Sequence, residues 1–183
     1  VTATPTIIPP ALVQIASTDT GTVVQGYVTV NIIPAQAGNL LVAGFAADKT
    51  SGGTMTTPLG FTLLNNQIGN SVSGGMAYKI AVGGETSVTW SYSNPTKTSA
   101  FVMEFSGLAT ANVLDQSVEA SSGETAITSL TAGPTSLVAG SAVSVAMIAI
   151  DTFDNFGVLS ISAPYSVQVK DGYTTGGGIA VAW

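Results

Sequence analysis

No long segment of the chain places apolar residues at the three- and four-residue spacing of an amphipathic helix. Charged residues that would cover exposed helix faces are also scarce, because they make up only 8% of the chain. Short runs of Thr, Val, Ile, Ser and Gly instead alternate with turn residues. This pattern predicts an all-β protein.

We expect about twelve short strands at roughly regular spacing, which is typical of a sandwich or a barrel. The run at 39–48 is continuously apolar, as in a central strand that is buried on both faces. The expected strands are residues 21–33, 39–48, 59–68, 75–82, 86–93, 99–107, 113–120, 125–131, 139–151, 158–163, 165–171 and 177–183. The strands at 86–93 and 99–107 are joined by Asn94-Pro95, and Gly83-Gly84-Glu85 is a candidate tight turn.

A weak repeat relates the two halves of the chain. In each half a long strand that ends in Asp is followed by a loop, a strand led by Pro, and then Gly-Gly with a further strand. The two copies begin at residues 37 and 139. Two similar Greek-key halves make up a jelly roll. We therefore predict a jelly-roll-like antiparallel β-sandwich, with residues 11–183 as one domain.

Residues 1–10 precede this domain as an extended arm rich in Thr and Pro. We expect the arm to attach the protein to a neighbour by adding to a sheet edge. Its candidate attachment residues are Pro5, Ile7, Ile8, Pro9 and Pro10. No positively charged region precedes an apolar run, so the sequence shows no signal peptide. The most apolar segment, 137–150, is too short to cross a bilayer.

The residue types that the chain lacks restrict its chemistry. With no His and no Cys, it cannot assemble a Ser-His-Asp triad, a Cys nucleophile or a structural zinc site. With no Arg and a net charge of −6, it is poorly suited to neutralising phosphate groups. We therefore expect a non-enzymatic protein whose partners include neither nucleic acid nor membrane.

Glu104 is a lone carboxylate in the apolar run FVMEFSG, on the opposite strand face from Phe101, Met103 and Phe105. A desolvated acid can serve as a general acid, but a glycosidase needs a second carboxylate. No spacing selects one among Glu85, Asp115 and Glu119. We expect Glu104 to be structural, bound either by loop amides or by a Lys such as Lys79.

Two further groups of side chains suggest ligands. Asp151, Asp154 and Asn155 form a small acidic loop whose oxygens would suit Ca²⁺, although Asx turns explain them equally well. No other cofactor is expected. Trp90, Tyr92 and Tyr173 are candidates for stacking on a sugar, but Trp90 and Tyr92 share one strand face and are as readily explained as core residues.

The segment Glu104-Phe105-Ser106-Gly107, followed by Asn112, Leu114 and Asp115, resembles a motif of jelly-roll-like β-sandwich modules in phage virion proteins and bacterial surface proteins. The resemblance extends over most of residues 37–151 and includes PLGFT at 58–62, where Phe61 replaces the more usual Trp. It implies a non-catalytic structural or adhesive module, in which Glu104, Gly107 and Asp115 have structural roles.

The sequence and the resemblance together predict a structural protein of a virion or particle surface, such as a capsid decoration or head-fibre subunit. We expect it to form a homo-oligomer, most readily a trimer, and to contact a capsid or other particle protein. The alternative is a carbohydrate-binding or adhesive module of a tail fibre or of a secreted bacterial protein, located outside the cell or at its surface.

Overall fold

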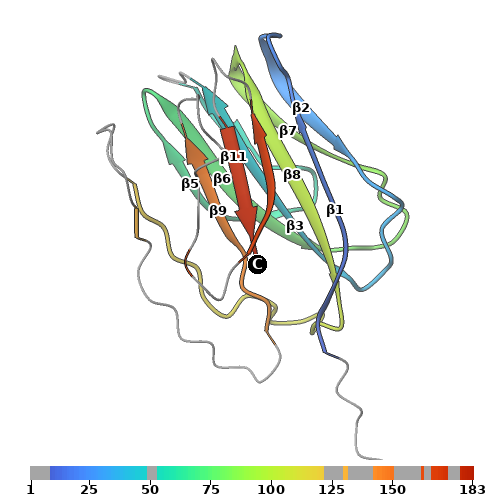
Figure 1. The fold of residues 1–183 in the computed structure, drawn as a ribbon. Coiled ribbons are helices and arrows are strands. Elements are labelled where there is room, and N and C mark those ends of the chain that lie inside the picture. The colour runs from blue at the N-terminus through green and yellow to red at the C-terminus, as the bar shows by residue number, and fades with distance from the viewer. Residues whose placement is uncertain are drawn as a thin grey trace, which may run out of the picture.

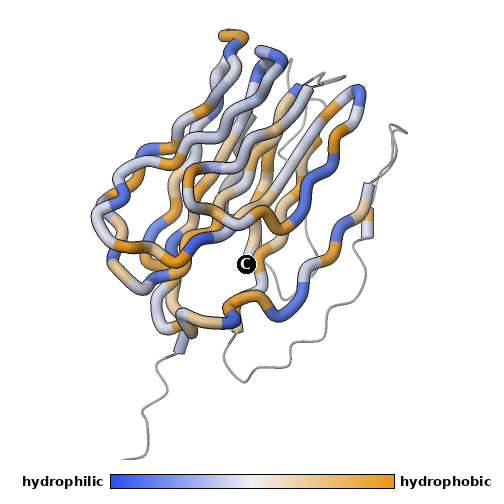
Figure 2. Tube along the Cα trace, turned by 180° about the vertical axis from the view of Figure 1, so that it is seen from behind, coloured by the Kyte–Doolittle hydropathy of each residue, from blue (hydrophilic) through white to orange (hydrophobic). Residues whose placement is uncertain are grey.

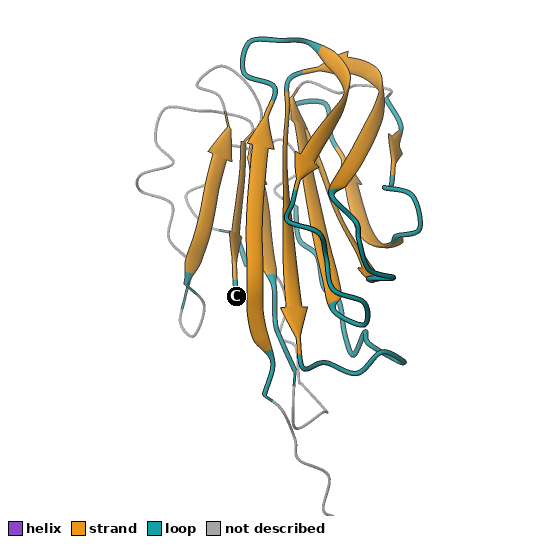
Figure 3. Cartoon of the chain, turned by 90° about the vertical axis from the view of Figure 1, so that its right-hand side faces the viewer, coloured by secondary structure: helices purple, strands orange, loops and turns teal. Residues whose placement is uncertain are grey.

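The computed structural model describes residues 9–48, 53–121, 130–131, 142–150, 162, 166–172 and 178–183. Within these ranges the chain consists of strands and loops (Figure 3). The described part of the chain accordingly holds no helix long and apolar enough to cross a membrane. Its strands form antiparallel sheets that pack face to face, so the predicted all-β sandwich is confirmed.

Eleven strands are present in the described residues. They are β1 (Ala11–Asp19), β2 (Gln25–Asn31), β3 (Leu40–Asp48), β4 (Met55–Thr56), β5 (Thr62–Ile68), β6 (Val72–Ile80), β7 (Ser87–Thr96), β8 (Thr98–Ser106), β9 (Ala146–Ile150), β10 (Val167–Gly172) and β11 (Gly178–Ala182). The central sheet has the order β1-β8-β3-β6-β5. Two three-stranded sheets have the orders β2-β7-β4 and β10-β11-β9.

The first eight strands pair in the manner of a jelly roll (Figure 1). β1 pairs with β8, β2 with β7, and β3 with β6, as in a long hairpin that is rolled into two sheets. β5 departs from this pattern because it pairs with β6 in the central sheet. Among the described residues, the jelly-roll pairs therefore all lie between residues 11 and 106.

The central sheet is covered on both faces. One apolar cluster lies between it and the sheet β2-β7-β4, and includes Val28, Val30, Leu41, Phe45, Val88, Trp90 and Tyr92. A second cluster lies between the central sheet and β9-β11, and includes Val42, Phe101, Met103, Phe105, Ile179 and Val181. Figure 1 shows β9 and β11 on one side of the central strands and β2 and β7 on the other. The molecule thus has three layers.

The apolar runs of β3 and β8 explain why these strands are central. In both strands the residues contribute alternately to the two clusters, so that nearly every side chain is buried. β7 follows the other pattern, with Val88, Trp90 and Tyr92 buried and the residues between them exposed. In Figure 2, hydrophilic and hydrophobic stretches alternate along the parts of the trace nearest the viewer.

The sequence repeat corresponds to two three-stranded units. In the first, the order β3-β6-β5 places the third strand of the unit in the middle. In the second, the order β9-β11-β10 does the same. In each unit the Pro-led strand has an irregular register, at Leu63/Asn65 in β5 and at Val167/Val169 in β10. The second unit forms a sheet of its own, and the sequence did not predict this third layer.

Three strand predictions need correction or lie outside the described part. Residues 113–120 are irregular and mostly exposed, so the strand predicted there is wrong. β1 and β4 were not predicted. The residues of β1 do not alternate regularly between apolar and polar, because the register of the strand shifts between Leu12 and Gln14. The strands predicted at 125–131 and 158–163 lie almost wholly outside the described residues.

Candidate functional site

Glu104 lies in the interior of the central sheet, between β1 and β3. It is opposite Gln14 on β1 and Leu41 on β3, and only 1% of its surface is exposed. The register shift before Gln14 brings that side chain opposite the carboxylate. Glu104 is therefore enclosed by the fold and cannot be reached by a substrate.

Each oxygen of this carboxylate accepts hydrogen bonds. Oε1 accepts from the backbone N–H of Gln36 at 2.9 Å and from Nδ2 of Asn39 at 2.6 Å. Oε2 accepts from Nε2 of Gln14. The amide of Gln14 also bonds both the N–H and the C=O of Ile33. Glu104 thus fastens the connection between β2 and β3, and one of its donors, the N–H of Gln36, is a loop amide.

These bonds determine the ionisation of Glu104. Burial on its own would raise the pKa, but the three donors stabilise the charged form, and the net effect lowers the pKa below its ordinary value. The carboxylate is therefore ionised at neutral pH. Lys79, which we considered as its partner, lies 2.8 Å from Glu85 instead.

The other residues of the motif lie after β8. Gly107 has a φ of 77°, a left-handed conformation that favours glycine and that ends the strand. Asn112 is the one other residue of the motif with a positive φ, at 52°. Asp115 is exposed in the irregular segment that follows. The motif therefore begins with the buried Glu104 in β8 and continues through the end of that strand into an irregular segment.

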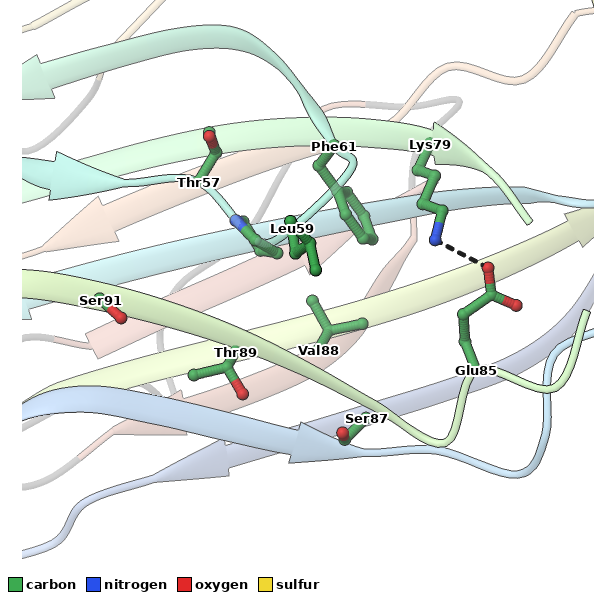
Figure 4. A pocket seen from close by; sticks show the side chains of 10 residues that line it. Thr57, Leu59, Phe61, Lys79, Glu85, Ser87, Val88, Thr89 and Ser91 are labelled. Carbon is green, nitrogen blue, oxygen red and sulfur yellow. Dashed lines mark ion pairs between the residues drawn. The ribbon is translucent and has the colours of Figure 1, made fainter. Parts of the chain in front are cut away.

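A second cluster of polar groups lines a groove of about 340 Å³ (Figure 4). One wall is β7, and the other is the connection between β4 and β5. Its lining residues are Thr57, Pro58, Leu59, Phe61, Lys79, Glu85, Ser87, Val88, Thr89 and Ser91. The Lys79–Glu85 ion pair lies in this lining, and Nζ of Lys79 is 6.0 Å from the centre of the Phe61 ring.

Glu85 is strongly stabilised as a carboxylate. Burial opposes ionisation, but the bond from Lys79 and those from the backbone N–H groups of Val82 and of Glu85 itself lower its pKa to about 2. The N–H groups of Val82 and Gly83 donate to the two carboxylate oxygens, each at 2.9 Å. The two N–H bonds also close the turn between β6 and β7, which was predicted as a tight turn at Gly83-Gly84-Glu85. Sequence spacing did not indicate the groove, because its walls come from residues that are distant in the chain.

Acid is expected to destabilise the protein through Glu85 and Glu104. Because their pKa values in the folded chain lie below the ordinary 4.5, both carboxylates stabilise the fold above that pH, and the contribution is lost as the pH falls towards 2. Thermal denaturation between pH 7 and 2 measures the effect. Glu85→Gln should flatten the curve below pH 4.5. A melting temperature independent of pH over this range would contradict the assignment.

The aromatic residues proposed for sugar stacking are not accessible. Trp90 and Tyr92 are 0% and 3% exposed, and both rings stack against Phe45, with centroids 5.6 and 6.1 Å apart. The sugar-stacking hypothesis is therefore wrong for these two residues, which belong to the core. Tyr173 lies outside the described residues. The aromatic ring that does line the groove is Phe61.

Several other candidates also lie outside the described residues, namely Asp151, Asp154 and Asn155 of the calcium hypothesis, and Pro5, Ile7 and Ile8 of the arm. Pro9 and Pro10 are described and lead directly into β1. Within the described ranges, no three acidic side chains come together as a group that could hold a metal ion.

Comparison with known proteins gives no relative: no family model, no curated protein and no solved structure matches the chain.

Proposed function

We propose that this protein is a non-enzymatic structural subunit of a virion or other particle surface, and that it assembles through contacts with copies of itself and with a particle protein. The buried Glu104 carboxylate carries the proposal. It is the acid that the sequence singled out as a candidate for chemistry, and its bonds fasten β8 to β1 and to the β2–β3 connection. A side chain so enclosed serves stability, not turnover.

The fold and the composition add support. Jelly rolls are frequent in capsid proteins and lectins, although a fold alone does not determine function. The exposed face of β7 presents the hydroxyl groups of Ser87, Thr89 and Ser91 in place of charges. An uncharged surface of this kind suits a protein that binds its partners through complementary shape.

Electron microscopy of particles from the native source, labelled with an antibody against the chain, tests the proposal. Regular labelling of a capsid, tail or filament is expected, together with a homo-oligomer, most readily a trimer, in native mass spectrometry. A purified chain that converts a substrate with saturable kinetics would refute the proposal.

Deletion of residues 1–10 is expected to weaken assembly and to leave the domain folded. The arm precedes β1, and the sheets of the described residues are formed by strands that begin at Ala11. We expect the dissociation constant of the oligomer to rise by about tenfold or more, equivalent to about 1.4 kcal/mol. Analytical ultracentrifugation and circular dichroism measure the two quantities. A Gly/Ser segment of equal length is the control, and unchanged assembly of the truncated chain would count against the arm.

A second candidate function is glycan binding. The observation that favours it is the groove, which is lined by the Phe61 ring and by the hydroxyl groups of Ser87 and Thr89. A glycan array compares the native chain with Phe61→Ala. Specific binding that is lost in this variant would favour an adhesive module over a purely structural subunit.

A further inference from the structure

The outer sheet β2-β7-β4 has an incomplete edge. β4 pairs only with Ser91 and Tyr92, although β7 begins at Ser87. The ladder with β2 is regular here, and the N–H of Ile32 bonds the C=O of Thr86. By the alternation of an antiparallel ladder, the backbone groups of Ser87 and Thr89 then point away from β2. No strand of the described residues pairs with them on that side.

The chain leaves this edge at Pro58. The N–H of Ser93 bonds Thr54, and Met55 and Thr56 continue the pairing, so Pro58 would be the next residue to bond β7. Proline has no N–H to donate. The C=O of Pro58 instead accepts from the N–H of Phe61 in a turn that leads into β5. The groove therefore occupies the place of a missing strand.

The groove has the form of a site for an extended segment. It follows β7 from Ser87 to Ser91, a length of about 14 Å at the rise of a strand. On the opposite wall, the side chain of Leu59 is 97% exposed, which is unusual for a large apolar residue. The ends of Lys79 and Glu85 neutralise each other, so the site favours an uncharged segment.

We infer that the arm of a second copy of this chain adds as a strand to the open edge of β7. The inference rests on the proposed function, in which the arm is the attachment element, and it names the surface that receives the arm. Addition of an extended segment to a sheet edge is a common mode of protein recognition.

Only one of the two alternate sets of arm residues can form the backbone hydrogen bonds to this edge. Thr2, Thr4 and Thr6 alternate with Ala3, Pro5 and Ile7. Pro5 cannot donate a hydrogen bond, so the residues that bond β7 must be the threonines. In a sheet, paired residues share a face. The three threonines would thus extend the outer hydroxyl row, in which Oγ1 of Thr89 lies 2.8 Å from Oγ1 of Thr29.

The opposite face of the arm fits equally well. Ala3, Pro5 and Ile7 would turn inwards, toward the side of the sheet where Phe61 packs against the core. The arm carries no charged residue, in keeping with the neutral lining of the groove. In this pairing the threonine face of the arm would lie beside the outer hydroxyl groups, and the apolar face would lie toward the core.

The length of the arm favours a second copy over the same chain. Three strand spacings separate β1 from β6, whose Lys79 lines the groove, which is about 14 Å, and the groove lies one layer away, about 10 Å further. With Thr4 and Thr6 on β7, the connection from Thr6 to Ala11 is five Cα–Cα steps and spans at most about 18 Å. The two displacements together correspond to a straight line of about 17 Å, and that line crosses the sandwich, because β2 contacts β1 and pairs with β7. An arm of the same molecule would have to pass around β2 and β7, and the connection is too short for that path.

Cross-linking tests the pairing, because the native chain has no cysteine. A Thr4→Cys or Thr6→Cys chain is mixed with an isotope-labelled Thr89→Cys chain, and mixed disulfides are counted by mass spectrometry. A Thr62→Cys chain is the matched control, because Thr62 is an exposed threonine on β5, the open edge of the central sheet. Mixed disulfides with Thr89→Cys at several times the control yield are expected. Equal yields, or disulfides that form only between copies of the same variant, would overturn the inference.

Proline substitution tests the register. Thr4→Pro removes an N–H that bonds β7 and should weaken self-association at least about fivefold, whereas Ala3→Pro removes one that points away and should change it less than about twofold. Both changes leave the described domain untouched. Equal effects would refute the inference and leave the proposed function standing, while unchanged assembly on deletion of residues 1–10 would refute the arm as the attachment element.

Hydrogen exchange identifies the occupant. A synthetic peptide of residues 1–8 is added to the chain that lacks residues 1–10, and exchange at the amides of Ser87 and Thr89 should slow. The amides of Val88 and Trp90, which already bond β2, are the internal control. Protection by a glycan but not by the peptide would overturn the inference.

Discussion

Replacement of Glu104 with Ala is expected to lower the free energy of unfolding by about 3–5 kcal/mol. The substitution leaves three donors without their acceptor, namely the N–H of Gln36 and the side-chain amides of Asn39 and Gln14. The donor of Asn39 is buried, and a buried donor that loses its partner costs about 1–3 kcal/mol. The bonds from Gln36 and Gln14 are partly buried and add smaller contributions. Glu104→Gln keeps the shape and one acceptor oxygen, so its expected cost is smaller, about 2 kcal/mol. Urea denaturation at pH 7 measures both.

Glu119→Ala is the matched control. Glu119 is an exposed carboxylate that accepts one bond, from Nε2 of Gln67, and its loss should change stability by less than about 0.5 kcal/mol. If Glu104→Ala lowered the free energy of unfolding as little as this control, the hydrogen bonds to Glu104 would not stabilise the fold. If Glu104→Gln kept full stability but abolished a chemical turnover, Glu104 would be catalytic and the proposed function would fail.

The sequence could predict the position of Glu104 but not its partners. Alternation along β8 placed the carboxylate on the face opposite Phe101 and Met103, and those residues lie in the cluster beneath β11. Its three donors are 65 to 90 residues away in the chain. Such contacts are set by the sheet order, which no local pattern contains. Lys79, the possible partner from the sequence, is one of four lysines in the chain and pairs with Glu85.

Strands were predictable where burial imposes a clear pattern. β3 and β8 are buried on both faces, and their apolar runs gave correct positions. Residues 113–120 also contain apolar residues, but Leu114 and Val118 are 44% and 41% exposed and pair with no strand of the described residues. β7 and β8 follow one another directly in the chain, yet they belong to different sheets. Local patterns determine an element, and distant contacts determine its neighbours.

The groove could not be predicted for the same reason. Its open edge arises because β5 pairs with β6 and leaves β4 with two residues. Pro58 belongs to the PLGFT segment of the resemblance, and in the structure it stops the pairing with β7. Only the sheet order shows that the strand led by this proline joins the other layer.

Replacement of Gly44 with Val is expected to lower the free energy of unfolding by about 3 kcal/mol. Gly44 lies in β3 on the face that packs against β9, and a Cβ there would overlap the ring of Phe101 and lie 2.5 Å from Sδ of Met147. Phe101 is fully buried and has no space into which to retreat. The third layer can therefore pack closely only because position 44 has no side chain. Denaturation in urea and near-ultraviolet circular dichroism measure the loss.

Two variants separate this cause from a general effect of valine. Thr62→Val places the same side chain on the exposed edge strand β5 and should be nearly neutral. Met147→Ala removes one of the two groups that the new side chain at position 44 would meet, so its effect and that of Gly44→Val should be less than additive, by about 1 kcal/mol. Full additivity would show that β9 does not pack against Gly44. The three-layered arrangement depends on this contact and on the similar one between Gly74 and Ala149, where a Cβ would be 2.7 Å from that of Ala149.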